Sequence, residues 1–191
     1  KRLKPLPNTF EYTPINFIQT RGVYENHVNE IEAEQVLSII ENNIKPYPSG
    51  KYPTVGVATL NIAQRDLIKG RIYERRKLNH YKDFNDKMES LENEGFFVKN
   101  LENIQGDERD IIILSTTYGC NREGKFYQRF GPINQKKGYK LLNVIITRAK
   151  YKVYVCTSIP EDEIAKYRFY LDLEKANNKR AVFFAYLAYA K

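Results

Sequence analysis

Hydrophobic positions recur with helical spacing in the first half of the chain. Over 29–44, six apolar side chains fall three or four residues apart on one face, and acidic residues gather at the start. Asn29 is suited to cap this helix, and Glu32 occupies the capping-box position. A second helix is expected over 61–80, capped by its first residue, and a more polar one over 83–92.

Short apolar runs alternate with these helices. The segments 54–59, 111–114 and 153–156 contain consecutive apolar or small residues, which is typical of strands buried on both faces of a parallel sheet. Shorter runs at 15–18 and 96–98 are expected to add two strands. Because strands alternate with helices, the sequence predicts an α/β fold with a mainly parallel sheet.

The remaining pattern completes one domain. Residues 118–137 form a long glycine-containing loop, and 138–150 an unusually apolar helix. Two closing helices are expected over 167–176 and 181–190.

This pattern divides the chain into three parts. We expect a lead-in from a preceding domain over 1–22, the α/β domain over 23–159, and a C-terminal helical extension over 160–191.

The composition is that of a globular protein with a basic surface. The 191 residues carry a formal net charge of +8, and nine basic residues face one acid between 121 and 152. Such a concentration suggests a polyanionic partner, either nucleic acid or nucleotide phosphates, but a solvated lysine-rich surface accounts for the charge about equally well. No run of 18 apolar residues occurs, so the sequence predicts no membrane span and no membrane partner.

The sulfur and imidazole content argues against a metal site. Cys120 and Cys156 each lie in or beside an apolar run, and His27 and His80 are the other candidate soft ligands. Two buried thiols fit a cytoplasmic protein, and no metal ligands are predicted.

Three polar segments are expected beyond the carboxyl ends of strands, where ligands bind in open α/β sheets. They are 59–65, 98–110 and 140–149. Arg148 lies in the apolar third segment, so it must have a partner: an internal acid such as Asp110, or a phosphate group at the domain edge.

Together the three segments resemble motifs IV, V and VI of superfamily 1 helicases, in the branch that includes the RNA-surveillance helicases and bacterial relatives. The first, 56–65, is a strand and a helix that carries Gln64-Arg65. The second, 104–115, reads Ile-Gln-Gly-Asp-Glu-Arg-Asp and then Ile-Ile-Ile-Leu-Ser. The third, 140–149, retains Leu-Asn-Val and Thr-Arg-Ala, and 29–33 resembles the start of the family's domain.

The resemblance implies the second RecA-like motor domain of such a helicase, a three-layer α/β/α domain without a P-loop of its own. No G-x-x-x-x-G-K-[ST] occurs, so the chain alone is expected not to hydrolyse ATP. ATP and Mg²⁺ would be held mainly by a first RecA-like domain of the same parent protein. The other implied partner is single-stranded nucleic acid, DNA being favoured over RNA, with a monomer as the default.

The resemblance also assigns roles to residues. Arg148 and Arg65 would be the catalytic cations on the γ-phosphate, Arg148 as an arginine finger. The residues implied at the nucleotide are Gly106, Glu108, Gln105 and Gln64. Those implied at the nucleic-acid backbone are Thr59, Lys99 and Asn100.

Two features depart from the family pattern. Motif VI has Lys140-Leu141 where two arginines are usual, and Ile104 replaces the usual aromatic residue of motif V. Both departures put auxiliary contacts in doubt, and neither involves Arg148.

Two other functions remain open from the sequence. One is a metal-dependent nuclease, for which Glu123-Gly124-Lys125 with Asp110 upstream provides an E-x-K pattern. The other is a non-enzymatic module that binds nucleic acid and keeps only the RecA-like shape.

Overall fold

The computed structural model describes residues 14–78, 82–104, 106–135, 138, 140, 143–144, 147–167 and 179–191. Gln105 and the segment 168–178 therefore lie outside the described residues, and with them most of the predicted helix 167–176.

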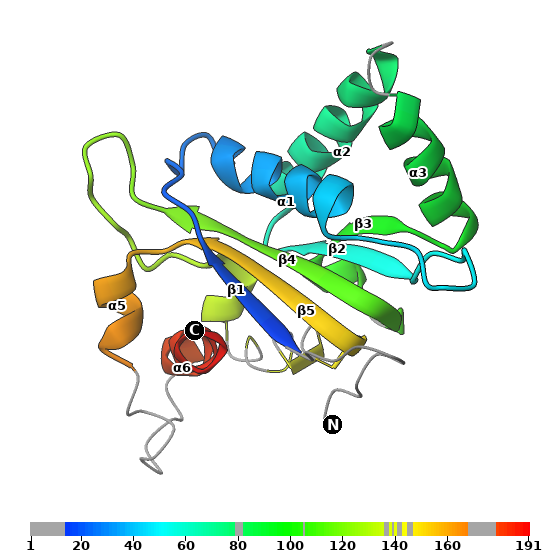
Figure 1. Cartoon of the computed structure of the whole chain (residues 1–191). Helices are drawn as coiled ribbons and strands as arrows, with labels where there is room; N and C mark the ends of the chain where they lie inside the picture. Colours follow the sequence, from blue (N-terminus) through cyan, green and yellow to red (C-terminus); the bar gives the residue numbers. More distant parts are fainter. Residues whose placement is uncertain are drawn as a thin grey trace.

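Five parallel strands form one sheet in the order β1-β5-β4-β2-β3 (Figure 1). The strands are β1 (Ile15–Gln19), β2 (Val55–Thr59), β3 (Phe97–Asn100), β4 (Arg109–Gly119) and β5 (Ala149–Ser158). The predicted parallel α/β fold is confirmed. β4 and β5 are much longer than the apolar runs that predicted them, because their polar ends are hydrogen-bonded within the sheet.

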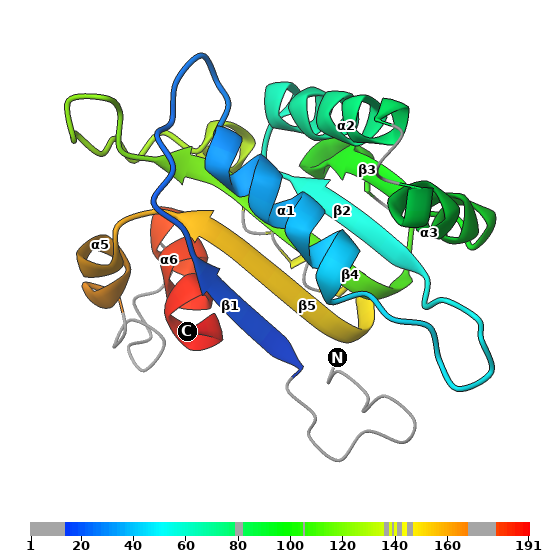
Figure 2. The ribbon, with the colours of Figure 1, turned by 45° about the horizontal axis from the view of Figure 1, so that its top comes forward.

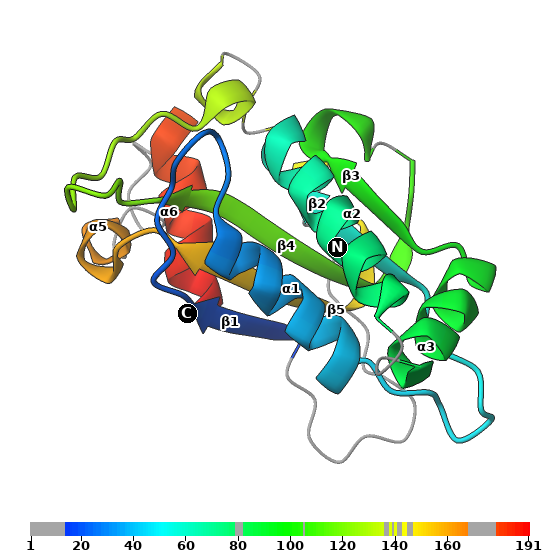
Figure 3. The ribbon, with the colours of Figure 1, turned by 90° about the horizontal axis from the view of Figure 1, so that it is seen from above.

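Helices cover both faces of the sheet. On one face, α1 (Glu30–Asn42) lies over β4 and β5, α2 (Ile62–Lys77) over β2 and β3, and α3 (Lys82–Asn93) beside α2 (Figure 2). On the other face lies α6 (Lys179–Ala190), preceded in the chain by the short α5 (Glu161–Ala165) (Figure 3). Two 3₁₀ turns, η2 (Leu101–Asn103) and η3 (Gly131–Asn134), complete the described elements. No helix among the described residues is long and apolar enough to cross a membrane.

The alternation of side chains in β4 divides the core in two. Ile111 and Ile113 belong to the cluster beneath α1 and α2, whereas Ile112 and Leu114 belong to the cluster on the α6 side. All four are nearly or fully buried, and burying each stabilises the fold by about 1.5–3 kcal/mol. The strand is therefore apolar on both faces, as its sequence predicted.

Two predicted boundaries need correction. β1 lies in the predicted lead-in over 1–22, yet it pairs with β5 from Ile15↔Val153 to Gln19↔Thr157, so it is an integral strand of the sheet. The predicted extension over 160–191 includes α6, whose Phe183, Phe184 and Leu187 are fully buried in the core. It therefore supplies one of the two helical layers.

The predicted helix over 138–150 is also too long. Asn143 and Val144 are helical, but Thr147 and Arg148 form a turn and β5 begins at Ala149. Arg148 thus lies in the turn before a strand, not inside a helix.

Candidate nucleotide site

The start of α2 is fixed by two asparagines. The side chain of Asn61 caps the helix by accepting from the Gln64 backbone N–H at 2.8 Å. Gln64 is fully buried, and its Oε1 accepts from the Asn29 N–H at 2.8 Å while its Nε2 donates to the Asn29 carbonyl at 2.9 Å. Gln64 therefore ties α2 to the beginning of α1, and its predicted contact with nucleotide is wrong because its amide is enclosed by the protein.

Arg65 follows on the same helical turn and remains partly accessible. Its Nε donates to Asp66 Oδ1 at 2.8 Å, and its Nη1 to Asn100 Oδ1 at 3.3 Å, at the end of β3. The side chain is 22% exposed. The guanidinium is therefore held at the carboxyl end of β2 and β3.

The motif V segment runs back along the sheet from the end of β3 to the start of β4. Lys99 donates to Asp107 Oδ2 at 2.6 Å and fastens the returning segment to β3. Gly106 is exposed, with φ at +90° and no heavy atom within 4 Å of where a Cβ would lie. Glu108 is half-buried, and its carbonyl accepts from Arg109 Nη1 at 2.8 Å. The open backbone at Gly106 permits close approach of a ligand.

Arg148 is oriented by its own turn. Its Nε donates to the Val144 carbonyl at 3.1 Å and its Nη2 to Thr147 Oγ1 at 3.2 Å. Its carbonyl accepts from the Arg109 N–H at 2.9 Å, which joins this turn to the end of the motif V segment. No ion pair joins Arg148 to a carboxylate within the described residues.

The internal acid that the sequence offered to Arg148 has another partner. Asp110 Oδ2 accepts from the Thr54 N–H at 3.0 Å, and the Asp110 N–H donates to Thr54 Oγ1 at 2.8 Å. The structure therefore does not support the Arg148–Asp110 pair.

The two arginines lie at opposite ends of the strands. Arg65 follows β2, whose Thr59 is level with Ser115, whereas Arg148 is bonded to Arg109 at the beginning of β4. Six residues of strand separate these levels, or about 20 Å along the sheet. The 98–110 segment begins at the carboxyl end of β3, as expected, and then returns to the amino end of β4. The 140–149 segment precedes β5, so the expectation that it lies beyond a carboxyl end is wrong for that segment.

These residues fit a phosphate-bearing ligand by their chemistry. A guanidinium has five N–H donors. The bonds above engage two of Arg148 and two of Arg65, and Arg65 Nη2 also lies 2.8 Å from Asp66 Oδ1, so three donors of Arg65 are engaged. Both side chains are only partly buried. Each can therefore donate to a phosphate oxygen without releasing its protein contacts.

The predicted backbone-binding residues divide by exposure. Thr59 is fully buried and its Oγ1 donates to the Asn61 carbonyl at 2.7 Å. Asn100 is 2% exposed and accepts from Arg65 and Asn103. Direct contact of Thr59 or Asn100 side chains with nucleic acid is therefore contradicted. Lys99 remains half-exposed.

Comparison with known proteins adds the family. A family model described as an AAA domain matches residues 10–159. An uncharacterized ATP-dependent helicase of Mycoplasma genitalium is 37% identical over 134 residues, and its homologue in Mycoplasma pneumoniae is 37% identical over 135. The chain belongs to this family of superfamily 1 helicase AAA domains. The matched region is 69% of this chain and 11% of each relative, so the chain spans a small part of the proteins it resembles.

The nuclease alternative does not fit this helicase domain. Asp110 lies at the beginning of β4 and Glu123 beyond its end, about 30 Å apart by the strand rise. Glu123 and Lys125 are bonded to each other at 2.9 Å and are both well exposed. The E-x-K residues and Asp110 therefore cannot share a metal ion.

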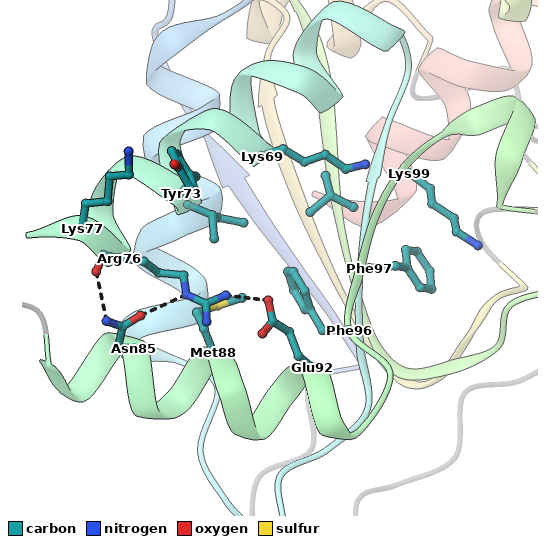
Figure 4. Close-up of a pocket in the computed structure, with 12 residues that line it drawn as sticks. Lys69, Tyr73, Arg76, Lys77, Asn85, Met88, Glu92, Phe96, Phe97 and Lys99 are labelled. Atoms are coloured by element: carbon teal, nitrogen blue, oxygen red, sulfur yellow. Dashed lines mark hydrogen bonds and ion pairs between the residues drawn. The ribbon is translucent and has the colours of Figure 1, made fainter.

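A pocket of about 780 Å³ lies between α2, α3 and β3, and side-chain bonds join the two helices across it (Figure 4). Arg76 crosses it from α2, donating to Asn85 Oδ1 at 2.9 Å and Glu92 Oε1 at 2.6 Å on α3. Lys99 is the one predicted site residue that lines it. The volume of this pocket therefore does not mark the nucleotide site.

The sequence did not predict that the Glu32 carboxylate is buried at the carboxyl ends of β4 and β5. It accepts from Ser115 Oγ, Thr117 N and Ser158 N at 2.7 Å each, and from Thr116 Oγ1 at 3.2 Å. Burial raises its pKa to about 7, although these hydrogen bonds favour the charged form. Glu32 therefore joins α1 to the ends of β4 and β5. The sequence signal for Glu32 was its place in the 29–33 motif, but that position predicted only a capping-box role.

Proposed function

We propose that the chain is the second motor domain of an ATP-dependent helicase or translocase. In this proposal Arg148 reaches the γ-phosphate of an ATP that a first RecA-like domain of the parent protein binds. Arg65, about 20 Å from Arg148 along the sheet, cannot contact the same phosphate while it keeps its bonds to Asp66 and Asn100, so the second cation that the resemblance implied is not retained. Glu108 and Gly106 contact the nucleotide sugar, and Gln105, outside the described residues, relays the nucleotide state to the nucleic-acid face.

The observation that carries the proposal is the state of Arg148. A half-buried guanidinium whose described partners are a carbonyl and a hydroxyl keeps its full charge for an anion. Arg148 also lies beside the motif V segment, because its carbonyl accepts from the Arg109 N–H. A structural arginine of similar burial, Arg75, instead pairs with Glu34 and Glu41.

ATP with Mg²⁺ supplies the transferable phosphoryl group when bound by the parent protein. The residue of this chain that acts on the transferred group is Arg148, whose guanidinium donates to phosphate oxygens, where charge spreads during transfer. The missing P-loop explains why the chain alone is proposed to be inactive. The proposed second ligand is single-stranded nucleic acid, DNA in preference to RNA, and the proposed location is the cytoplasm.

ATP hydrolysis by the complete parent protein tests this proposal, with and without a single strand. Arg148→Ala should lower the stimulated rate by about 10³–10⁵-fold, the usual worth of an arginine finger. The control is Arg71→Ala, which removes surface ion pairs on α2. If the parent shows no strand-stimulated hydrolysis, the non-enzymatic binding module becomes the better account. Wild-type rates in Arg148→Ala would remove the finger role.

A further inference from the structure

A second pocket, of about 620 Å³, lies at the carboxyl end of β4. Its lining residues come from the loop between β1 and α1, the start of α2 and the segment that joins β4 to η3. Figure 3 shows the course of these segments. None of the residues proposed to contact the nucleotide lines this pocket, although Asn61, which caps α2, does. Its lining includes three tyrosines, Tyr24, Tyr118 and Tyr127, together with His27 and Arg129.

The rings form an aromatic wall with one open side. Tyr24 packs against Tyr118 with centroids 5.1 Å apart and against His27 at 6.5 Å. Tyr118 is almost fully buried, whereas Tyr127 is 53% exposed. The Arg129 guanidinium lies 5.7 Å from the Tyr127 ring centroid. An exposed ring beside buried ones offers a planar ligand a surface on which to stack.

The backbone around the pocket is held in unusual conformations. Asn26 and His27 both have positive φ, 49° and 66°. The His27 carbonyl accepts from Asn61 Nδ2 at 3.0 Å, which fastens this loop to the start of α2. Gly131 has φ at 48°, and a Cβ there would lie 3.3 Å from the Tyr118 hydroxyl. Such conformations cluster at ligand sites, where the surrounding structure maintains them.

Charge distinguishes Arg129 from its neighbours on the same segment. Arg122 pairs with Glu25 at 2.7 Å, and Lys125 with Glu123 at 2.9 Å. Arg129 is exposed and, among the described residues, has no ion pair with a carboxylate. Among the described residues of this segment, Arg129 is therefore the cation without a carboxylate partner, and it lines the aromatic pocket.

We propose that this pocket receives one base of a single-stranded nucleic acid, with the base on Tyr127 and an adjacent phosphate on Arg129. Stacking on aromatic side chains with a cation beside them is how proteins bind single strands without reading sequence. The volume accommodates a nucleotide-sized group. The inference rests on the proposed function only in taking a single strand as the ligand.

The test is binding of fluorescently labelled oligonucleotides to the complete parent protein without ATP, measured by anisotropy. One strand is a 20-nucleotide oligothymidylate, and the other is an abasic strand of equal length. Tyr127→Ala should weaken the thymidylate complex by about 5–100-fold and leave the abasic complex unchanged. Tyr127→Phe, which retains the ring, should bind like wild type. Arg129→Ala should weaken both complexes.

Tyr73→Ala is the matched control. Tyr73 is 61% exposed on α2 and has Lys77 Nζ 4.2 Å from its ring centroid, so it repeats the tyrosine–cation pair away from the pocket. The inference is overturned if Tyr127→Ala binds thymidylate like wild type. It is also overturned if both strands are weakened equally, because Tyr127 would then act on the sugar-phosphate backbone or on the fold and not on a base.

Failure of this inference can be told from failure of the proposed function. Base-dependent binding through Tyr127 in a parent without ATP hydrolysis would keep the pocket and remove the motor. Strand-stimulated hydrolysis with no effect of Tyr127→Ala would keep the motor and remove the pocket. A parent that binds neither strand would contradict both.

Discussion

Replacing Glu32 with alanine should destabilise the domain strongly, because this carboxylate is hydrogen-bonded to the carboxyl ends of β4 and β5. Its two oxygens accept from the Thr117 and Ser158 backbone N–H groups and from the Ser115 and Thr116 hydroxyls. Hydroxyl groups can rotate toward other acceptors, but the two backbone N–H groups cannot.

The magnitude follows from those two groups. Each buried donor left without an acceptor costs about 1–3 kcal/mol, so Glu32→Ala should lower the free energy of unfolding by about 2–6 kcal/mol. Glu32→Gln keeps one carbonyl oxygen and leaves a single backbone N–H facing an NH₂ group, so at pH 8, where the Glu32 carboxyl is mainly ionised, its cost should be about half.

Urea unfolding followed by circular dichroism at pH 8 measures both changes. Glu30→Gln is the control, since Glu30 lies on the same helix but pairs with Arg71 at the surface, where such pairs contribute about 0–1 kcal/mol. Losses below 1 kcal/mol in both Glu32 variants would refute the view that this carboxylate holds the strand ends.

The raised pKa of Glu32 predicts that the free energy of unfolding depends on pH. Glu32 has a pKa of about 7 in the folded protein, above its ordinary value of 4.5, so between these values the folded state binds more protons than the unfolded state. The contribution of Glu32 to the free energy of unfolding should therefore fall as pH rises from about 4.5 to 7 and then level off. Glu32→Gln, which cannot titrate, should lose this slope. An unchanged slope would assign it to other groups.

Three further changes test the packing. Phe130→Ala should cost about 3–5 kcal/mol in urea unfolding, since its fully buried ring contacts four other aromatic rings; a cost below 1 kcal/mol would contradict this. Gly106→Ala should cost about 1–2 kcal/mol from its positive φ alone, because nothing obstructs a Cβ there; a neutral effect would mean that the turn relaxes. Cys156, whose pKa burial raises well above its ordinary value, should react with iodoacetamide only on unfolding, whereas the partly exposed Cys120 reacts first in mass-spectrometric labelling.

Local features of the fold were accessible from the sequence because they depend on local chemistry. Asn29 and Asn61 cap their helices as predicted, since a short side-chain acceptor before an amphipathic run has few alternatives. The strand at 111–114 was evident from four consecutive apolar residues. Its extension through Thr116 and Thr117 was not, because these residues are hydrogen-bonded to Glu32, 84 and 85 residues earlier in the chain.

Candidates for the site could be identified from the sequence, but their geometry could not. Motif spacing identified Arg65 and Arg148, but it did not show that one follows a strand and the other precedes one. The burial of Thr59, Gln64 and Asn100 was also inaccessible, because polar side chains that bond to distant segments look like surface residues in a sequence.

The central claim is that Arg148 stabilises charge on a transferring phosphoryl group. Its most direct test is the affinity of the complete parent protein for ADP with aluminium fluoride, which mimics that group, compared with ADP alone. Wild type should bind the mimic far more tightly than ADP, because interactions specific to the transition state appear in such analogues. Arg148→Ala should lose most of this difference and keep its affinity for ADP. A variant that retains the full preference for the mimic would contradict the account.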